Sequence, residues 1–328
     1  MYILKSIIVL KFLPQIAIYY HKFIPKALIL LILFDFDKKK IYYIIRYNNV
    51  IKEMGWLDMK IGISTGCLYP MLTENSVELL TDIGFDTLEI FFNSFSELEP
   101  DYLDRLRYIL DKKGASVASV HPFTSSYESF LLFSNYERRF EDGIKFYEMF
   151  FRTAQKLSAD KVILHGLSTD YRSSLENEEY FRRFERLRDT ARAYGTELLQ
   201  ENVAKFKSGD PLFISDMKNY FGEDIGFVCD TKQARRKGLS PVVFTDIMGT
   251  SLKHVHISGY TDGNECILPD ESSAPATESF VRHLIQTGYQ GDIIIEVYRF
   301  SFENISQLAK TKKYLENIVK KYSGLEVI

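Results

Sequence analysis

The fold of this chain is decided by the stretch Glu197-Leu-Leu-Gln-Glu201-Asn202 and by three later segments of the same kind. These are Gly226-Phe-Val-Cys-Asp230-Thr231, Lys253-His-Val-His256-Ile257 and Asp292-Ile-Ile-Ile-Glu296-Val297. Each is a short run of strand character that ends near a Glu, Asp or His, and stretches of helical pattern separate them. Strands that alternate with helices predict βαβ units and a parallel sheet. If the sheet closes into a barrel, the carboxyl ends of all its strands meet at one face, where barrels carry their active sites.

The same alternation extends over most of the chain. Strands are predicted at 60–66, 87–92, 115–121, 161–165, 196–202, 225–231, 252–258 and 292–298. Helices are predicted at 74–83, 100–113, 136–157, 177–194, 211–221, 240–248, 277–287 and 305–321. Eight strand–helix pairs are the number found in a (β/α)8 TIM barrel, and 328 residues are enough to build one. We therefore predict an α/β fold with a single TIM-barrel domain over residues 59–328, and loops at 122–135 and 259–276.

The first 58 residues differ from the rest in composition. They hold nine Lys or Arg and four acidic residues, a net charge of +5, and they are crowded with Ile, Leu, Tyr and Phe. Their longest apolar run, 27–34, is too short to span a bilayer. We interpret Met59 as the natural start and residues 1–58 as an upstream extension whose place in the natural protein is in question. A membrane-surface anchor is the competing interpretation, because basic and apolar residues together suit an interface.

Charge and cysteine content narrow the class of protein further. The net charge of the whole chain is −3, so residues 59–328 carry −8, which does not suit a nucleic-acid binder. The three cysteines, Cys67, Cys229 and Cys266, are odd in number and have no paired spacing, so we expect reduced thiols and a cytoplasmic location. We expect neither a nucleic-acid partner nor a membrane partner for the barrel.

Glu201, Asp230, His256 and Glu296 are the strongest candidates for chemistry. A single acidic residue at a strand end is more often a helix cap or the start of a solvated loop. Four such residues at successive strand ends are much less easily explained in that way. Three carboxylates and one imidazole form a mixed oxygen and nitrogen site for one divalent ion, and Mn²⁺, Mg²⁺, Co²⁺ and Zn²⁺ all suit it.

Two further histidines, His121 and His165, end the third and fourth predicted strands. A lone histidine on a strand is usually a satisfied structural residue. These two are predicted to lie on the same rim as the four metal candidates, which favours contact with substrate hydroxyls or with further metal. His254 lies two residues before His256 and faces the same way one layer deeper, where a structural role is expected.

Other charged residues near the predicted rim have weaker claims. Glu89 points from the second strand and either orients a metal ligand, contacts substrate or has a buried hydrogen-bonded role. Arg299 follows the last strand and suits an anionic substrate group, although a surface salt bridge is an equal alternative. The run Arg235-Arg236-Lys237 follows the sixth strand, and such a run is usually just solvated.

These residues resemble the sugar phosphate isomerase/epimerase group of the xylose-isomerase-like TIM barrels. The motifs that carry the resemblance are Lys60-Ile-Gly-Ile-Ser64, Ser119-Val-His121-Pro122, Val162-Ile-Leu-His165-Gly166, Leu199-Gln-Glu201-Asn202, Val228-Cys-Asp230-Thr231, His254-Val-His256 and Gly288-Tyr-Gln-Gly-Asp-Ile-Ile-Ile-Glu296. The resemblance implies that Glu201, Asp230, His256 and Glu296 hold one divalent metal, and that Glu201 and Glu296 are also the acid and base. His121 and His165 match positions that bind substrate, or extra metals in the related apurinic endonucleases.

Two positions depart from the pattern of this group. Relatives often carry His three residues after the aspartate of the sixth strand, where this chain has Gln233. Glutamine bonds a hydroxyl but is a poor metal ligand, which weakens the case for a three-metal nuclease and for aldose–ketose chemistry. The second departure is Leu268-Pro-Asp-Glu-Ser272, where relatives often have a glycine-rich turn.

The activity that the resemblance implies is isomerisation or epimerisation of a small sugar, ketose or polyol derivative. A metal would stabilise the enediolate formed when a proton next to a carbonyl is removed. The alternatives are an apurinic endonuclease-like phosphodiesterase, a metal-dependent sugar dehydratase and a non-catalytic sugar-binding barrel. The expected partner is a small-molecule sugar, and the resemblance is compatible with a homo-oligomer.

Overall fold

The computed structural model describes residues 31–35, 40–44 and 59–323. The chain divides into two compact units, residues 1–57 and 58–328. Within the first unit, β1 (Leu31–Asp35) and β2 (Lys40–Ile44) form an antiparallel pair. The remainder of the predicted extension, residues 1–58, lies outside the described residues.

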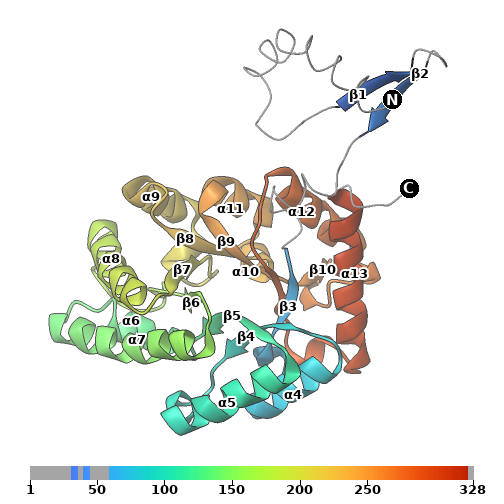
Figure 1. Ribbon diagram of the computed structural model, residues 1–328. Coiled ribbons are helices and arrows are strands. Elements are labelled where there is room, and N and C mark those ends of the chain that lie inside the picture. Colours follow the sequence, from blue (N-terminus) through green and yellow to red (C-terminus); the bar gives the residue numbers. More distant parts are fainter. Residues whose placement is uncertain (1–30, 36–39, 45–58, 324–328) are drawn as a thin grey trace, which may run out of the picture. The chain divides into compact units, whose positions relative to one another are not determined.

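The second unit is a closed barrel of eight parallel strands (Figure 1), as predicted. Around the barrel the strands pair in the order β12-β3-β4-β5-β6-β7-β8-β9. Their bounds are β3 (Ile61–Ser64), β4 (Thr87–Phe91), β5 (Ser116–His121), β6 (Lys161–Leu164), β7 (Glu197–Glu201), β8 (Gly226–Asp230), β9 (Leu252–Ile257) and β12 (Ile293–Ile295). Because all eight run in the same direction, their carboxyl ends share one face of the barrel.

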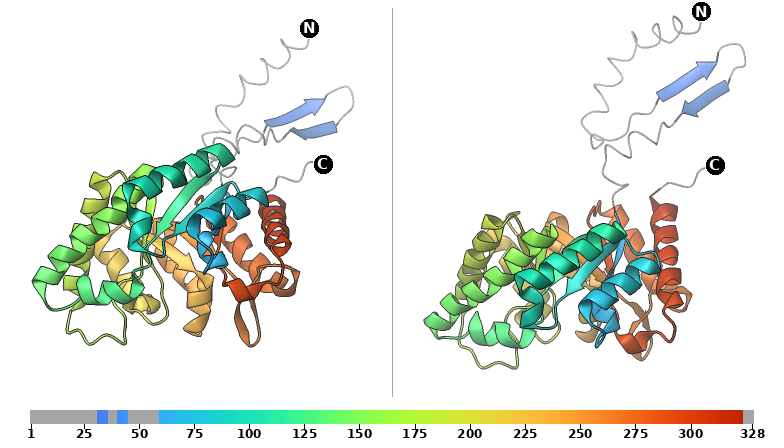
Figure 2. Two further views of the ribbon diagram at one scale, coloured as in Figure 1. Left: turned by 90° about the horizontal axis from the view of Figure 1, so that it is seen from below. Right: turned by 60° about the horizontal axis from the view of Figure 1, so that its bottom comes forward.

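Helices surround the strands on the outside of the barrel, as the views in Figures 1 and 2 show. They are α4 (Thr73–Asp82), α5 (Pro100–Lys113), α7 (Glu137–Leu157), α8 (Asn177–Ala193), α9 (Pro211–Phe221), α11 (Pro241–Met248), α12 (Ala274–Gln286) and α13 (Ser306–Tyr322). Each predicted helix is present with closely similar bounds. α5 shows why: it begins at Pro100, whose fixed backbone suits a first turn, and is capped after Lys113 by Gly114, whose φ of 65° is left-handed.

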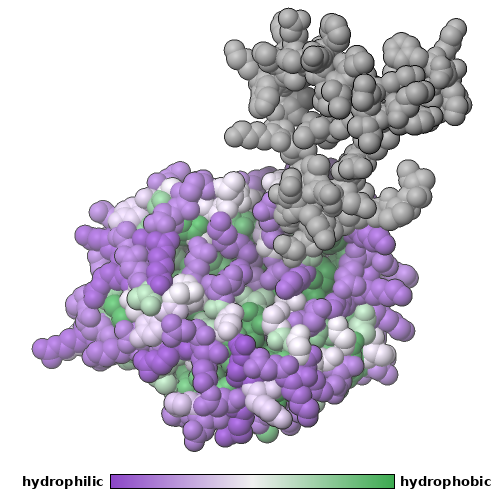
Figure 3. Space-filling view, viewed as in Figure 1, coloured by the Kyte–Doolittle hydropathy of each residue, from purple (hydrophilic) through white to green (hydrophobic). Residues whose placement is uncertain are grey.

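The core lies inside the barrel and between strands and helices. Every residue of β8 is buried, and so are Ile163, Leu199 and Val228, which pack together from three adjacent strands. Burial on both faces is typical of parallel strands and explains the continuous apolar runs in the sequence. On the face seen in Figure 3, hydrophilic side chains predominate and apolar ones show between them.

Two segments that were predicted as loops have regular structure. The segment after β5 contains α6 (Ser125–Leu131), which is fixed by Tyr147 of α7 donating a 2.6 Å hydrogen bond to Glu128. After β9, β10 (Gly259–Thr261) and β11 (Asn264–Ile267) form an antiparallel hairpin. Its turn is Asp262-Gly263, a dipeptide typical of two-residue hairpin turns, and Gly263 has a φ of 86°. The loop predictions at both places were wrong.

A short helix, α10 (Thr231–Arg236), follows β8 directly and was also not predicted. Cys67, Cys229 and Cys266 are free and buried, consistent with the expected reduced thiols. None of the helices within the described ranges combines the length and the apolar character that crossing a bilayer requires.

We expect a chain that begins at Met59 to fold without residues 1–58. The barrel closes entirely from strands that lie after Met59, and the two compact units divide next to this residue. Circular dichroism should show a cooperative thermal transition within a few degrees of that of the full chain, and the shortened chain should bind metal equally. Aggregation of the shortened chain under conditions where the full chain stays folded would show that the extension is a structural part.

Candidate metal centre

The four predicted metal ligands come together at the carboxyl face of the barrel. Glu201 ends β7, Asp230 ends β8, His256 lies near the end of β9, and Glu296 directly follows β12. Parallel pairing places Asp230 opposite His256, and His256 opposite Ile294 of β12. One ligand atom from each of the four residues lies within 4.8 Å of those of the others.

His256 lies at the centre of this four-residue cluster. Its Nδ1 is 3.3 Å from Glu201 Oε1 and also 3.3 Å from Glu296 Oε2. Glu201 and Asp230 are 1% exposed and His256 is fully buried, whereas the Glu296 side chain is 19% exposed. The cluster therefore reaches solvent on the side of Glu296.

The chemistry of the cluster fits a divalent cation. Three carboxylates in a buried space repel one another, and burial together with Glu296 and Glu201 raises the pKa of Asp230 despite the attraction of Lys232. Asp230 Oδ2 is buried and accepts no hydrogen bond from any described residue. Carboxylates and a neutral imidazole are ligands of Mg²⁺, Mn²⁺ and Zn²⁺, and metal–ligand bonds of about 2.0–2.2 Å are compatible with this spacing.

Glu89 lies beneath the cluster and holds His256 in place. Its Oε2 is 2.9 Å from His256 Nε2 and accepts a 2.8 Å hydrogen bond from Ser119. Glu89 is fully buried, as is His254, whose Nε2 is 3.1 Å from Ser119 Oγ. Since Nε2 of His256 faces Glu89, its Nδ1 is left to face the cluster. A carboxylate behind a histidine in this way orients metal-ligating imidazoles and fixes their tautomer.

His121 and His165 lie beside Glu201, on the rim where they were predicted. His165 Nε2 is 2.9 Å from Glu201 Oε2 and 3.2 Å from His121 Nε2. Burial by itself lowers the pKa of His165, but the Glu201 carboxylate outweighs it and raises the pKa to about 9. Burial lowers the pKa of His121. At neutral pH the pair therefore carries one positive charge, on His165.

Gln233 and Arg299 lie outside the four-residue cluster. The side-chain carbonyl of Gln233 accepts a 3.2 Å hydrogen bond from the Ala204 N–H and so joins α10 to the segment after β7. Arg299 is exposed, donates a 3.0 Å hydrogen bond to the carbonyl of Phe302 and lies over the ring of that residue.

Lys232 belongs to the site, but sequence reasoning missed it. Its Nζ is 3.1 Å from Glu296 Oε2 and 3.4 Å from Asp230 Oδ2, and the residue is 2% exposed. Burial alone would lower the pKa of Lys232, but Asp230 and Glu296 raise it, so the amine is charged. A cation in the first turn of a helix opposes the helix dipole, and this signal could have pointed to an acidic partner.

The fold and the cluster together define a TIM barrel with a candidate divalent-metal centre at the carboxyl face. The chain belongs to the family of xylose isomerase-like TIM barrels, whose model matches residues 77–318.

The chain is similar to one curated protein in sequence and to solved structures in fold. The uncharacterized protein MJ1311 of Methanocaldococcus jannaschii is 24% identical over 303 residues, which cover 86% of this chain and 99% of the relative. A D-tagatose 3-epimerase-like protein has a crystal structure with a TM-score of 0.67 and 21% identity, over 82% of this chain and 100% of that one. The IolI protein with a bound zinc atom gives a TM-score of 0.63 and 17% identity, over 80% and 99% of the two chains.

Proposed function

We propose that this protein is a divalent-metal-dependent isomerase or epimerase of a small sugar, ketose or polyol derivative. The observation that carries the proposal is that Glu201 and Glu296 approach the same imidazole nitrogen, each at 3.3 Å, from different strands. Two carboxylates that flank one metal centre can remove a proton beside a carbonyl and return one to the same carbon, for epimerisation, or to its neighbour, for isomerisation. The likeness to a D-tagatose 3-epimerase-like protein supports a sugar as the substrate class.

The four-residue cluster would hold the ion, which supplies charge stabilisation for the enediolate that proton removal creates. Of the two glutamates, one removes the proton next to the substrate carbonyl and the other returns a proton. Glu201 is buried against His165, whereas Glu296 is paired with Lys232 and reaches solvent. Burial alone would raise the pKa of each carboxyl, but His165 beside Glu201 and Lys232 beside Glu296 lower it, so both are ionised and able to take up a proton.

The remaining predicted residues take supporting roles in this proposal. His165 and His121 are the proposed partners of substrate hydroxyls, charged His165 as a donor and neutral His121 as an acceptor through Nε2, because the Nδ1–H of His121 donates to the Pro122 carbonyl. Gln233 offers its amide N–H₂ group at the rim, and Arg299 remains a proposed contact for an anionic group. We assign Glu89 to the orientation of His256 and not to substrate, because it is fully buried beneath that side chain.

A multi-metal phosphodiesterase is the second candidate function. The observation that favours it is a second group of potential ligands, His121, His165 and Glu201, whose ligand atoms also lie within 4.8 Å of one another. Gln233 and the charge of −8 over residues 59–328 count against it. Cleavage of DNA at abasic sites by the metal-loaded protein would establish this function in place of the first.

We expect Asp230→Ala and His256→Ala to lose most of the bound metal. Each substitution removes one of four ligands. The metal that elemental analysis finds after dialysis should therefore fall from about one equivalent per chain to a small fraction. Added Mn²⁺ should raise the melting temperature of the wild type, since an ion bound only by the folded state stabilises it, and should do so much less in the variants. His283→Ala, on α12 and paired with Asp246, is the matched control. A full equivalent of metal in both variants would remove these residues from the ligand set.

The activity itself is tested by incubating the metal-loaded protein with a panel of ketoses in D₂O. Deuterium should enter at the carbon next to the carbonyl, and mass spectrometry or NMR would detect it. Activity that survives exhaustive chelation would contradict a metal-dependent mechanism. Full metal occupancy without exchange on any ketose would instead favour dehydration or a sugar-binding role.

A further inference from the structure

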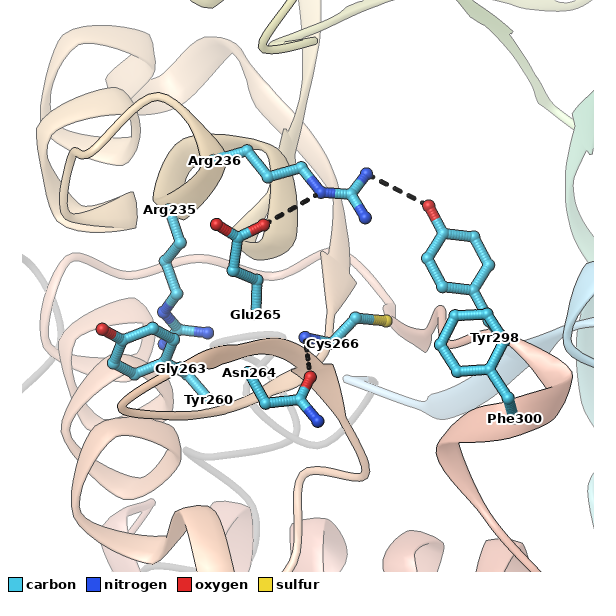
Figure 4. A pocket seen from close by; sticks show the side chains of 9 residues that line it. All are labelled: Arg235, Arg236, Tyr260, Gly263, Asn264, Glu265, Cys266, Tyr298 and Phe300. Carbon is cyan, nitrogen blue, oxygen red and sulfur yellow. Dashed lines mark hydrogen bonds and ion pairs between the residues drawn. The ribbon is translucent and has the colours of Figure 1, made fainter.

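A cavity of about 340 Å³ lies beside α10 and the hairpin β10–β11 (Figure 4). Its walls come from α10, from the hairpin β10–β11 and from the segment after β12. These three segments follow β8, β9 and β12, so the cavity opens on the same face of the barrel as the cluster. The polar side chains that matter here are Arg235, Arg236, Tyr260, Glu265 and Tyr298.

Arg235 brings a positive charge without a carboxylate partner among residues 59–323. Its Nη1 donates a 3.3 Å hydrogen bond to the carbonyl of Ser258, and its guanidinium group lies 4.8 Å from the centre of the Tyr260 ring. A guanidinium group has five N–H donors in a fixed fork. The contact with Ser258 therefore leaves donors of Arg235 available at the cavity.

Arg236 brings a second guanidinium group, held at the other side of Glu265 in the view of Figure 4. It donates a 3.1 Å hydrogen bond to the Tyr298 hydroxyl and a 3.3 Å hydrogen bond to Glu265 Oε2. Glu265 lies on the hairpin and its side chain is 48% exposed, and pairs as exposed as this one contribute little. An incoming anion can therefore compete with the Glu265 carboxylate for Arg236.

Tyr298 lines the cavity and also approaches Lys232, the charged neighbour of the cluster. Its ring centre lies 5.6 Å from the Arg236 guanidinium carbon and 5.0 Å from Lys232 Nζ. Lys232 in turn forms ion pairs with the proposed metal ligands Asp230 and Glu296. Tyr298 and Lys232 therefore connect the cavity to the cluster through two successive contacts.

We propose that the cavity binds the phosphate group of a phosphorylated sugar, with Arg235 and Arg236 as its main partners. This proposal rests on the proposed function, because it assigns a substrate class to the same site. A phosphate offers two negative charges and three acceptor oxygens to two guanidinium groups and a phenol hydroxyl, and arginine forks match its geometry. The loops after the seventh and eighth strands are also a frequent place for phosphate in TIM barrels. Here those loops are the hairpin β10–β11 and the segment that carries Tyr298.

The test is isothermal titration calorimetry, which measures the affinity of the metal-loaded full chain for D-fructose, D-fructose 6-phosphate and D-glucuronate. The phosphate ester should bind roughly 10- to 100-fold more tightly than fructose, as charge-assisted hydrogen bonds imply. Arg235→Met should abolish most of this advantage, whereas Glu265→Gln should increase it by freeing Arg236. Lys237→Met is the matched control, because Lys237 is exposed and follows the same helix but does not line the cavity. Arg235→Lys, which keeps the charge and loses the fork, guards against misfolding and should restore only part of the advantage.

Equal binding of fructose and its phosphate, or an unchanged advantage in Arg235→Met, would overturn the assignment. An Arg235-dependent preference for glucuronate over fructose 6-phosphate would replace phosphate by carboxylate and overturn it too. Deuterium exchange separates this proposal from the proposed function. If the phosphate ester binds in an Arg235-dependent way but no deuterium enters any sugar, whichever metal is added, the phosphate site is supported and the proposed isomerase or epimerase function is contradicted. If deuterium enters free sugars independently of Arg235 and the phosphate ester binds no more tightly than fructose, the proposed function is supported and the phosphate site is contradicted.

Discussion

Replacing Glu201 or Glu296 by glutamine should slow deuterium exchange into a ketose substrate by about 10²- to 10⁴-fold, the range expected for loss of a general acid or base. Glutamine keeps the size of the side chain but cannot take up a proton at neutral pH. Each glutamate lies 3.3 Å from His256 Nδ1 on its own side of the proposed metal centre, so neither can replace the other. The measurement is the initial rate of exchange in D₂O at saturating substrate.

Loss of metal must be separated from loss of proton transfer, because both glutamates are also proposed ligands. Each variant is therefore titrated with Mn²⁺ until elemental analysis shows full occupancy, and exchange is measured at that point. Glu303→Gln, an exposed position after β12, is the matched control and should exchange at the wild-type rate. Wild-type exchange in a metal-loaded Glu201→Gln or Glu296→Gln variant would show that the altered residue is not an acid or base.

Lys232→Met should destabilise the metal-free protein by roughly 3–5 kcal/mol, the cost of removing one partner from a buried ion pair. The amine is 2% exposed and lies within 3.4 Å of both Asp230 and Glu296, which would then repel each other with less compensation. For a domain of this size the melting temperature should fall by roughly 10 °C. Added Mn²⁺ should recover much of this loss and raise the melting temperature more than in the wild type.

Lys237→Met provides the control for this comparison, because it removes the same charge from an exposed position just after α10. Differential scanning calorimetry with and without Mn²⁺ gives the melting temperature of the metal-free protein and the rise in that temperature when metal binds. Equal melting temperatures for the metal-free wild type and Lys232→Met would show that Lys232 does not compensate the carboxylates. If Mn²⁺ raised the melting temperature less in Lys232→Met than in the wild type, the main role of Lys232 would be to position the carboxylates and not to offset their charge.

The barrel and the four-residue cluster could be predicted because both depend on local patterns. Apolar runs of strand length alternate with helical stretches, and parallel strands in a closed barrel bring their ends to one face. Residues at the ends of different strands, such as Glu201 and Glu296, are therefore brought together by topology alone. The position of each side chain along its own strand was enough to identify the candidate ligands.

The parts that escaped prediction depend on contacts between distant segments. Glu89 was a predicted candidate for orienting a metal ligand, but nothing local shows that its partner is His256, 167 positions away. The same holds for Arg236 and Tyr298, which meet across 62 positions. The charged run at Arg235 was interpreted as solvated because nothing local shows that the hairpin β10–β11 folds next to it. The turn at Asp262-Gly263 was the available sign of that hairpin.

One carboxyl group at the centre of the site is shared between a helix and the proposed ion. Asp230 Oδ1 accepts a 2.9 Å hydrogen bond from the Gln233 N–H as the N-cap of α10, which leaves Oδ2 for a cation. An ion that drew on both oxygens would take the cap from the helix, at a cost of roughly 1 kcal/mol. Ca²⁺ often reaches its shell of about six to eight oxygens through such bidentate carboxylates, whereas Mg²⁺ and Zn²⁺ need fewer ligands. Because the N-cap hydrogen bond of α10 occupies Oδ1, Asp230 favours binding an ion through one oxygen, and this disfavours calcium relative to magnesium or zinc.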